Sequence, residues 1–170
     1  MGRAFVFGDG INTDVLAPGV YMKAPIEELA RHCLESVDPT FASAVRSGDI
    51  VVGGRSFGAG SSREQAPQAL KHLGVAAVVA KSFGGIFYRN ALNLGLVVLV
   101  CADVDRIADG DDVSVDPRSG VIVNHSREET YAAEPLPEFL MEMIDAGGLV
   151  PHLEAKLARQ RQEGAQAQRP

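Results

Sequence analysis

Two continuous apolar runs, each directly after a glycine that can end a helix, constrain the fold of this chain more than any other feature. The runs cover residues 75–80 and 96–100, and the glycines are Gly74 and Gly95. A short apolar run bounded by turn residues predicts a buried strand, and a glycine just past a helical pattern predicts the end of the helix. Helices followed by buried strands, with many small residues and few aromatics (6 %), suit a compact α/β domain.

The remaining elements follow from the same periodicities. Strands are predicted at residues 3–7, 49–52, 113–116 and 121–123, and helices at 25–34, 63–73, 86–94, 137–146 and 150–157. The 170 residues suffice for one domain with a buried core, which we place at residues 1–158. Residues 159–170 are polar and rich in Gln and Arg, and this composition predicts a disordered tail.

Charge and cysteine content narrow the choice of partners. The net charge of −6 disfavours nucleic acid and anionic membranes, because both attract basic surfaces. The longest apolar run, residues 94–102, is too short to cross a bilayer. Cys33 and Cys101 stand apart without a Cys-x-x-Cys pattern, so we expect no metal or iron–sulfur ligands in this chain. Two such cysteines without a signal peptide indicate a reducing, cytoplasmic setting.

The loop before the predicted helix 63–73 is the stretch most indicative of chemistry. Gly58 and Gly60 flank a small residue, and Ser61, Ser62 and Arg63 follow at the predicted helix start. Glycines let the backbone approach a ligand closely. Unpaired N–H groups at a helix N-terminus would stabilise an ionised serine hydroxyl, and an arginine there can hold a carboxylate by two parallel hydrogen bonds.

The same loop also allows a purely structural interpretation. Ser61-x-x-Glu64 and Ser62-x-x-Gln65 both match the capping box, in which side chains satisfy the first N–H groups of a helix. The glycine spacing matches neither a Walker loop nor a dinucleotide-binding fingerprint. These residues alone therefore do not decide whether the loop is a structural helix start or a catalytic site.

Four stretches in register resemble one known family. Residues 58–64 resemble the G-x-G-S-S-R-E signature of the aconitase superfamily's swivelling domain, and the Ala66-Pro67 step that follows is usual in the small subunits of isopropylmalate isomerases. Residues 8–14 with 17–22 resemble the family's G-D-x-x-x-T-D loop and specificity segment. Residues 81–90 resemble its K-S-F-x-x-I-F-Y-R-N helix start, and residues 134–149 its C-terminal segment. The resemblance spans residues 5 to about 157.

The resemblance implies a fold, an activity and a partner. The fold is a three-layer β/β/α swivelling domain of the α/β class, as in the aconitase C-terminal domain. The activity is that of a hydro-lyase, which removes water from a small 2-hydroxy dicarboxylate and returns it at the neighbouring carbon. A separate large subunit carries the [4Fe–4S] cluster on three cysteines, and its open iron acts as Lewis acid on the departing hydroxyl. The present chain is then active only with that partner.

The resemblance also implies roles for individual residues. Ser61 maps to the base that removes a proton from carbon, and Asp14 to an orienting or proton-shuttling group beside it. Ser62 and Arg63 would bind substrate, with Gly60 and Thr13 completing this group. Tyr21, Met22 and Lys23 would form the specificity loop.

Several residues leave alternatives open. Asp14 could instead cap a turn, and Arg63 could form a surface ion pair with Glu64 or Glu28. Lys81 and Arg89 are interpreted as structural or interface residues, and the four histidines as surface or cap residues. Ala59 stands where the family often has Cys, and Gln65 where it often has His; neither change removes the proposed base or the carboxylate-binding arginine.

The substrate is the least constrained part of the prediction. Met22 and Ala24 are compatible with an apolar substituent, which favours 2- and 3-isopropylmalate and hence leucine biosynthesis. Lys23 could instead meet a third carboxylate, as in homoaconitate; citramalate and dimethylmalate are further candidates. An alternative of another class is a non-catalytic, anion-binding regulatory module, in which helix N–H groups merely hold an anion.

Overall fold

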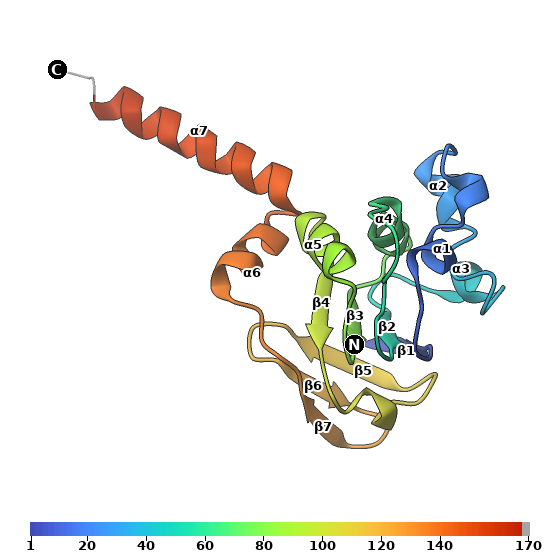
Figure 1. The fold of residues 1–170 in the computed structure, drawn as a ribbon. Coiled ribbons are helices and arrows are strands. Elements are labelled where there is room, and N and C mark those ends of the chain that lie inside the picture. Colours follow the sequence, from blue (N-terminus) through green and yellow to red (C-terminus); the bar gives the residue numbers. More distant parts are fainter. Residues whose placement is uncertain (168–170) are drawn as a thin grey trace.

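A mixed sheet with strand order β4-β3-β2-β1-β5-β6-β7 organises the chain, shown in the computed structural model of Figure 1. The structure describes the backbone of residues 1–167 and the side chains of residues 1–163. Strand β1 joins the two halves of the sheet, because it pairs parallel with β2 and antiparallel with β5. The parallel strands are β1 (Gly2–Val6), β2 (Ile50–Gly53), β3 (Ala77–Ala80) and β4 (Val97–Val100). The antiparallel strands are β5 (Asp112–Asp116), β6 (Val121–Asn124) and β7 (Glu129–Ala132).

Two hydrophobic cores show that the sheet halves and the helices form three layers. Successive side chains of a strand point to opposite faces: Val51 of β2 joins a core with the helices, whereas Ile50 and Val52 join a second core. That second core also contains Val113, Ile122 and Tyr131 from the antiparallel strands. The antiparallel half therefore packs on the face of the parallel half that the helices leave open (Figure 1). This arrangement confirms the predicted α/β, β/β/α fold class.

The helices are short apart from the last one. Their bounds are α1 (Thr13–Leu16), α2 (Ile26–Ala30), α3 (Phe41–Ala44), α4 (Gln65–His72), α5 (Gly85–Asn93), α6 (Glu138–Asp145) and α7 (Leu149–Ala167), with 3₁₀ turns at Gly19–Tyr21 and Val104–Arg106. Gly74 and Gly95 both adopt positive φ after α4 and α5, as predicted from the glycines that precede the apolar runs.

Two predicted helices are shorter than expected. The helix predicted at 25–34 ends at Ala30, and Leu34 adopts a φ of 62° while its N–H bonds to the carbonyl of Val15. The helix predicted at 63–73 begins only at Gln65, with Pro67 in its first turn, where its missing N–H costs no hydrogen bond. Strand β7 and helices α1 and α3 were not predicted.

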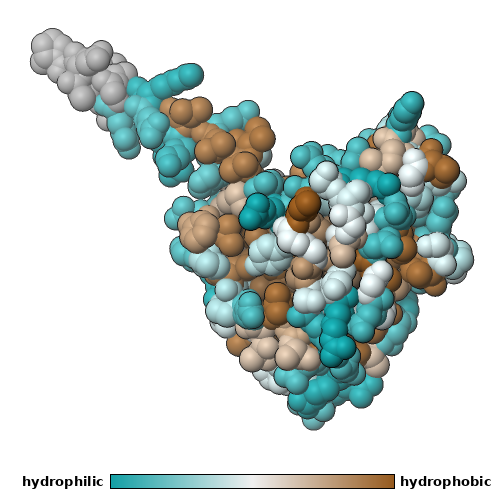
Figure 2. All heavy atoms as spheres, viewed as in Figure 1, coloured by the Kyte–Doolittle hydropathy of each residue, from teal (hydrophilic) through white to brown (hydrophobic). Residues whose placement is uncertain are grey.

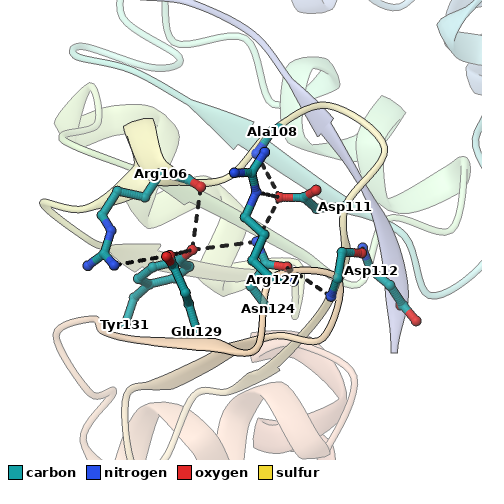
Figure 3. Close-up of polar contacts among 9 residues, drawn as sticks. Arg106, Ala108, Asp111, Asp112, Asn124, Arg127, Glu129 and Tyr131 are labelled. Carbon is teal, nitrogen blue, oxygen red and sulfur yellow. Dashed lines mark hydrogen bonds and ion pairs between the residues drawn. The ribbon is translucent and has the colours of Figure 1, made fainter.

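A buried network of hydrogen bonds connects the antiparallel strands to the loop that precedes β5 (Figure 3). Asp111 accepts hydrogen bonds from the N–H of Ala108 (2.9 Å), the amide of Asn124 (2.7 Å) and the guanidinium of Arg127 (2.8 Å). Burial raises the pKa of the Asp111 carboxyl, but these three hydrogen bonds and the charge of Arg127 outweigh it and hold that pKa below its ordinary value. The hydroxyl of Tyr131 lies 2.6 Å from Glu129 and extends the network along β7.

Helix α7 projects away from the rest of the chain in Figure 1. Apolar side chains gather along part of it in Figure 2, and among its described side chains the exposed large apolar ones are Val150, Leu153 and Leu157. The helix continues past the predicted domain boundary at residue 158, with exposed side chains at 159–163. The boundary and the disordered tail at 159–170 stay predictions, and residues 168–170 lie outside the described part.

Candidate active site

The two loops that carry the predicted site lie side by side because the strands before them are parallel neighbours. Val6 of β1 is in register with Val52 of β2, so both strands end at the same edge of the sheet. Backbone hydrogen bonds then link the loops: the N–H of Gly58 donates to the carbonyl of Ile11 (2.6 Å), and the N–H of Thr13 donates to the carbonyl of Ala59 (3.0 Å). Segments about 48 residues apart in sequence thus form one surface, beside the contact between α1 and α4.

Thr13 and Ser61 form the first pair across the two loops. The Thr13 hydroxyl accepts a hydrogen bond from the N–H of Ser61 (3.1 Å) and lies 3.1 Å from the Ser61 hydroxyl. Thr13 is only 1 % exposed, whereas Ser61 is exposed. Ser61, the predicted base, therefore faces solvent, and Thr13, which was predicted to bind substrate, contacts it from the buried side.

Asp14 and Arg63 form the second pair. They make an ion pair, and the Arg63 guanidinium also donates to the carbonyl of Ala17 (3.2 Å). Arg63 thus pairs with Asp14 rather than with Glu64 or Glu28. The side chain that caps α1 is Asn12, whose carboxamide oxygen accepts from the N–H of Val15 (3.0 Å).

The two serines do not open a helix, so that part of the prediction was wrong. Helix α4 begins at Gln65 with Glu64 as its N-cap, and no side chain makes a capping hydrogen bond there. Neither predicted capping box forms. Ser61 lies three residues before this cap, and its hydroxyl is within hydrogen-bond distance of the Thr13 hydroxyl.

Gly60 makes the close approach of the two loops possible. Its φ is 121°, a conformation that side-chain-bearing residues rarely adopt, and a Cβ atom placed there would lie 2.9 Å from the Thr13 hydroxyl oxygen. On the other side of the loop, the Asn90 amide of α5 lies 3.5 Å from the carbonyl of Ser62. The second serine is thereby held at the edge of the site, with its side chain exposed.

The predicted specificity loop lies beside Arg63, because a Cβ at Gly19 would be 3.9 Å from the guanidinium. Its three residues point in different directions. The Tyr21 ring stacks on His32 with ring centres 3.7 Å apart, Met22 packs partly buried against the main core, and Lys23 is exposed. Stacking gives His32 a structural role that the sequence did not single out.

The described residues contain no group of three or more His, Cys, Asp or Glu side chains that could hold a metal ion. Cys33 and Cys101 are free and buried, and burial is the main cause that raises the pKa of both thiols. No helix within residues 1–167 is both long and apolar enough to span a bilayer. Lys81, predicted to be a structural or interface residue, pairs with Asp105.

Comparisons with known proteins agree in one family. The family described as "Aconitase C-terminal domain" matches residues 21–103. The chain is 53 % identical over 152 residues to "3-isopropylmalate dehydratase small subunit 1" of Archaeoglobus fulgidus, covering 88 % of this chain and 94 % of the relative. It is 50 % identical over 153 residues to "Methanogen homoaconitase small subunit" of Methanothermobacter thermautotrophicus, covering 89 % and 88 %. A crystal structure of 3-isopropylmalate dehydratase from Methanocaldococcus jannaschii superimposes with a TM-score of 0.90 at 42 % identity, covering 95 % and 97 % of the two chains.

Proposed function

Because the chain belongs to the family of 3-isopropylmalate dehydratase small subunits, we propose that it is the small subunit of a two-chain hydro-lyase that interconverts 2- and 3-isopropylmalate. The observation that carries the proposal is the pairing of Thr13 with Ser61 and of Asp14 with Arg63 on one exposed surface. A candidate base beside a candidate carboxylate-binding cation is what abstraction of a proton next to a carboxylate requires. The reaction fits a step in leucine biosynthesis in the cytoplasm.

The proposed partner is a large subunit that carries the [4Fe–4S] cluster. Iron–sulfur clusters are held by several thiolates, and this chain offers two separate buried thiols that burial keeps protonated at neutral pH. The cluster therefore does not fit this chain, and we assign it to the partner, where one iron supplies Lewis-acid chemistry to the substrate hydroxyl. The exposed Ser61 and Ser62 are consistent with a site that a second chain covers.

Four side chains have proposed roles in the closed site. Ser61 removes the proton from the carbon beside a substrate carboxylate and returns it during rehydration. Arg63 holds a carboxylate, since its guanidinium can donate two parallel hydrogen bonds, and Asp14 sets its direction through the ion pair. Ser62 donates to substrate from the edge of the loop.

The substrate proposal rests on the specificity loop and on the relatives. Met22 is apolar and packs partly buried against the main core, while Lys23 is exposed and able to meet a carboxylate. One relative at 50 % identity is named a homoaconitase small subunit, so homoaconitate is the leading alternative, followed by citramalate and dimethylmalate.

The anion-binding module remains the alternative of another class, but the structure weakens its basis. That module needs the free N–H groups of α4 at the anion, and α4 begins after the Ser61–Arg63 segment. A Ser61→Ala change would leave such binding intact, because backbone groups would hold the anion.

The test is anaerobic co-expression with the cluster-bearing large subunit encoded in the same genome. Absorbance of the unsaturated intermediate would be followed on addition of isopropylmalate, homoaconitate or citramalate. We expect turnover only with both chains, highest with isopropylmalate, and lost in Ser61→Ala. The matched control is Ser47→Ala, since this exposed serine precedes β2 at the opposite edge of the sheet. Full activity of Ser61→Ala, or no turnover with any such partner, would contradict the proposal.

A further inference from the structure

We propose that Thr13 is a positioning residue, whose hydroxyl orients Ser61 and stabilises its deprotonated form rather than touching substrate. This inference rests on the proposed role of Ser61 as the base. It goes beyond that role by naming a side chain that stabilises the charge on Ser61, which lies three residues before the N-cap of α4.

When Ser61 is deprotonated, the Thr13 hydroxyl can take part in the contact with Ser61 only as the hydrogen-bond donor. A threonine hydroxyl has one proton and two lone pairs. Its oxygen already accepts from the N–H of Ser61 (3.1 Å), and the Ser61 hydroxyl oxygen is also 3.1 Å away. Once Ser61 loses its proton, its oxygen can only accept, so the proton in this contact must come from Thr13.

This contact favours the deprotonated serine over the neutral one. A hydrogen bond to a charged oxygen is shorter and about twice as strong as one between neutral groups. Thr13 is 1 % exposed, so water does not compete for its hydroxyl. The hydrogen bond therefore strengthens as the charge develops, which is the property required of a group that assists a poor base.

The surrounding backbone holds Thr13 in place. Its N–H is bonded to the carbonyl of Ala59, and α1 starts at Thr13 behind the Asn12 cap. Gly60 provides the space, since any side chain there would meet the Thr13 hydroxyl at 2.9 Å. The next residue of the same helix, Asp14, orients Arg63. Helix α1 thus positions both the base and the carboxylate-binding cation.

The test compares three chains, each co-expressed with the large subunit: wild type, Thr13→Val and Thr13→Ser. Valine keeps the shape and removes the hydroxyl, whereas serine keeps the hydroxyl. We expect Thr13→Val to lower kcat about 10- to 100-fold, the range for loss of a hydrogen bond to a charged group, with KM changed less than about threefold because substrate is not contacted. Thr13→Ser is expected to restore kcat to within about fivefold of wild type.

The outcomes separate this inference from the proposed function. If Ser61→Ala keeps turnover, the proposed role of Ser61 fails. If Ser61→Ala is inactive but Thr13→Val keeps wild-type kcat, only the inference is overturned. It is also overturned if Thr13→Ser is as impaired as Thr13→Val, or if KM rises while kcat holds. Should Thr13→Val fail to assemble, Thr13→Cys replaces it; a thiol is a weak donor, so kcat between those of Thr13→Ser and Ser61→Ala is expected, and wild-type kcat would refute the inference.

Discussion

Replacing Gly58 by alanine should destabilise the chain through two separable effects. Gly58 has a φ of 72°, and a Cβ there would lie 2.1 Å from a ring carbon of Phe87. Phe87 is 1 % exposed, and its ring lies against Phe57 and Phe83 at centre distances of 5.5 and 6.2 Å. Because the ring is buried and packed against two other rings, we expect backbone strain and overpacking both to contribute.

The expected loss in the free energy of unfolding is the sum of these two effects. Left-handed backbone costs an alanine roughly 1–2 kcal/mol, and overpacking a tight core costs roughly 1–3 kcal/mol. Gly58→Ala is therefore expected to lower the free energy of unfolding by about 2–5 kcal/mol. Gly10→Ala is the matched control, because its φ is 73° but no atom lies within 4 Å of the added Cβ; it should cost only the first term, about 1–2 kcal/mol.

The assay is urea unfolding of the isolated chain, followed by circular dichroism, with both variants fitted for midpoint and slope. Equal losses in the two variants would refute the steric argument. A double-mutant cycle checks it independently. Phe87→Ala removes the ring carbons at 2.1 and 2.6 Å but keeps the Phe87 Cβ, which is also 2.6 Å from the added Cβ. In that background Gly58→Ala should therefore cost less than in wild type, but still more than Gly10→Ala.

Three further predictions concern charge and burial. The folded-state pKa of Asp111 is depressed, so the stability that this carboxylate contributes is present above its unfolded pKa near 4 and is lost as pH falls through the lower folded value. Asp111→Asn should therefore lower the free energy of unfolding at pH 7 by about 1–3 kcal/mol. In urea titrations below about pH 4, the stability of this variant should also depend less on pH than that of wild type. Cys33 and Cys101 are buried with raised thiol pKa values, so a thiol-reactive dye should label neither in the native chain and both in urea; rapid native labelling would contradict this. Arg118 pairs with Glu138 and Asp145 at the surface. Arg118→Ala should leave the midpoint of thermal unfolding nearly unchanged, because exposed ion pairs contribute little to stability; a large drop in that midpoint would point to a packing role.

Buried strands were the part of the fold that the sequence predicted best. The runs at 75–80 and 96–100 became β3 and β4, because a strand with both faces buried needs no alternation and is recognised by its continuous apolar character. Strand β7 was missed because only Tyr131 of its four residues is buried, which leaves too weak an alternation to detect. Helices α1 and α3 have four residues each, too few for a helical period.

For the site, the motifs located the correct loops but not the contacts between them. Thr13 and Ser61 are 48 positions apart, and no local pattern shows that the threonine faces inward. The helix start was misplaced because Ser61-x-x-Glu64 is a valid capping pattern; the Ser61 N–H instead bonds to Thr13, and this long-range contact holds the segment in a non-helical path.

The central position of β1 has a consequence for the order in which the chain can fold during synthesis. Residues 2–6 are made before both strands that pair with them: one edge of β1 pairs with β2 and the other with β5, which ends at Asp116. At about 5–20 residues per second, the second edge waits on the order of ten seconds for its partner. Until then β1 presents an open edge able to pair with other chains. The N-terminal strand is thus the segment that a nascent-chain chaperone would need to shield longest, and a fusion partner attached before Met1 would emerge from the middle of the sheet rather than from its border.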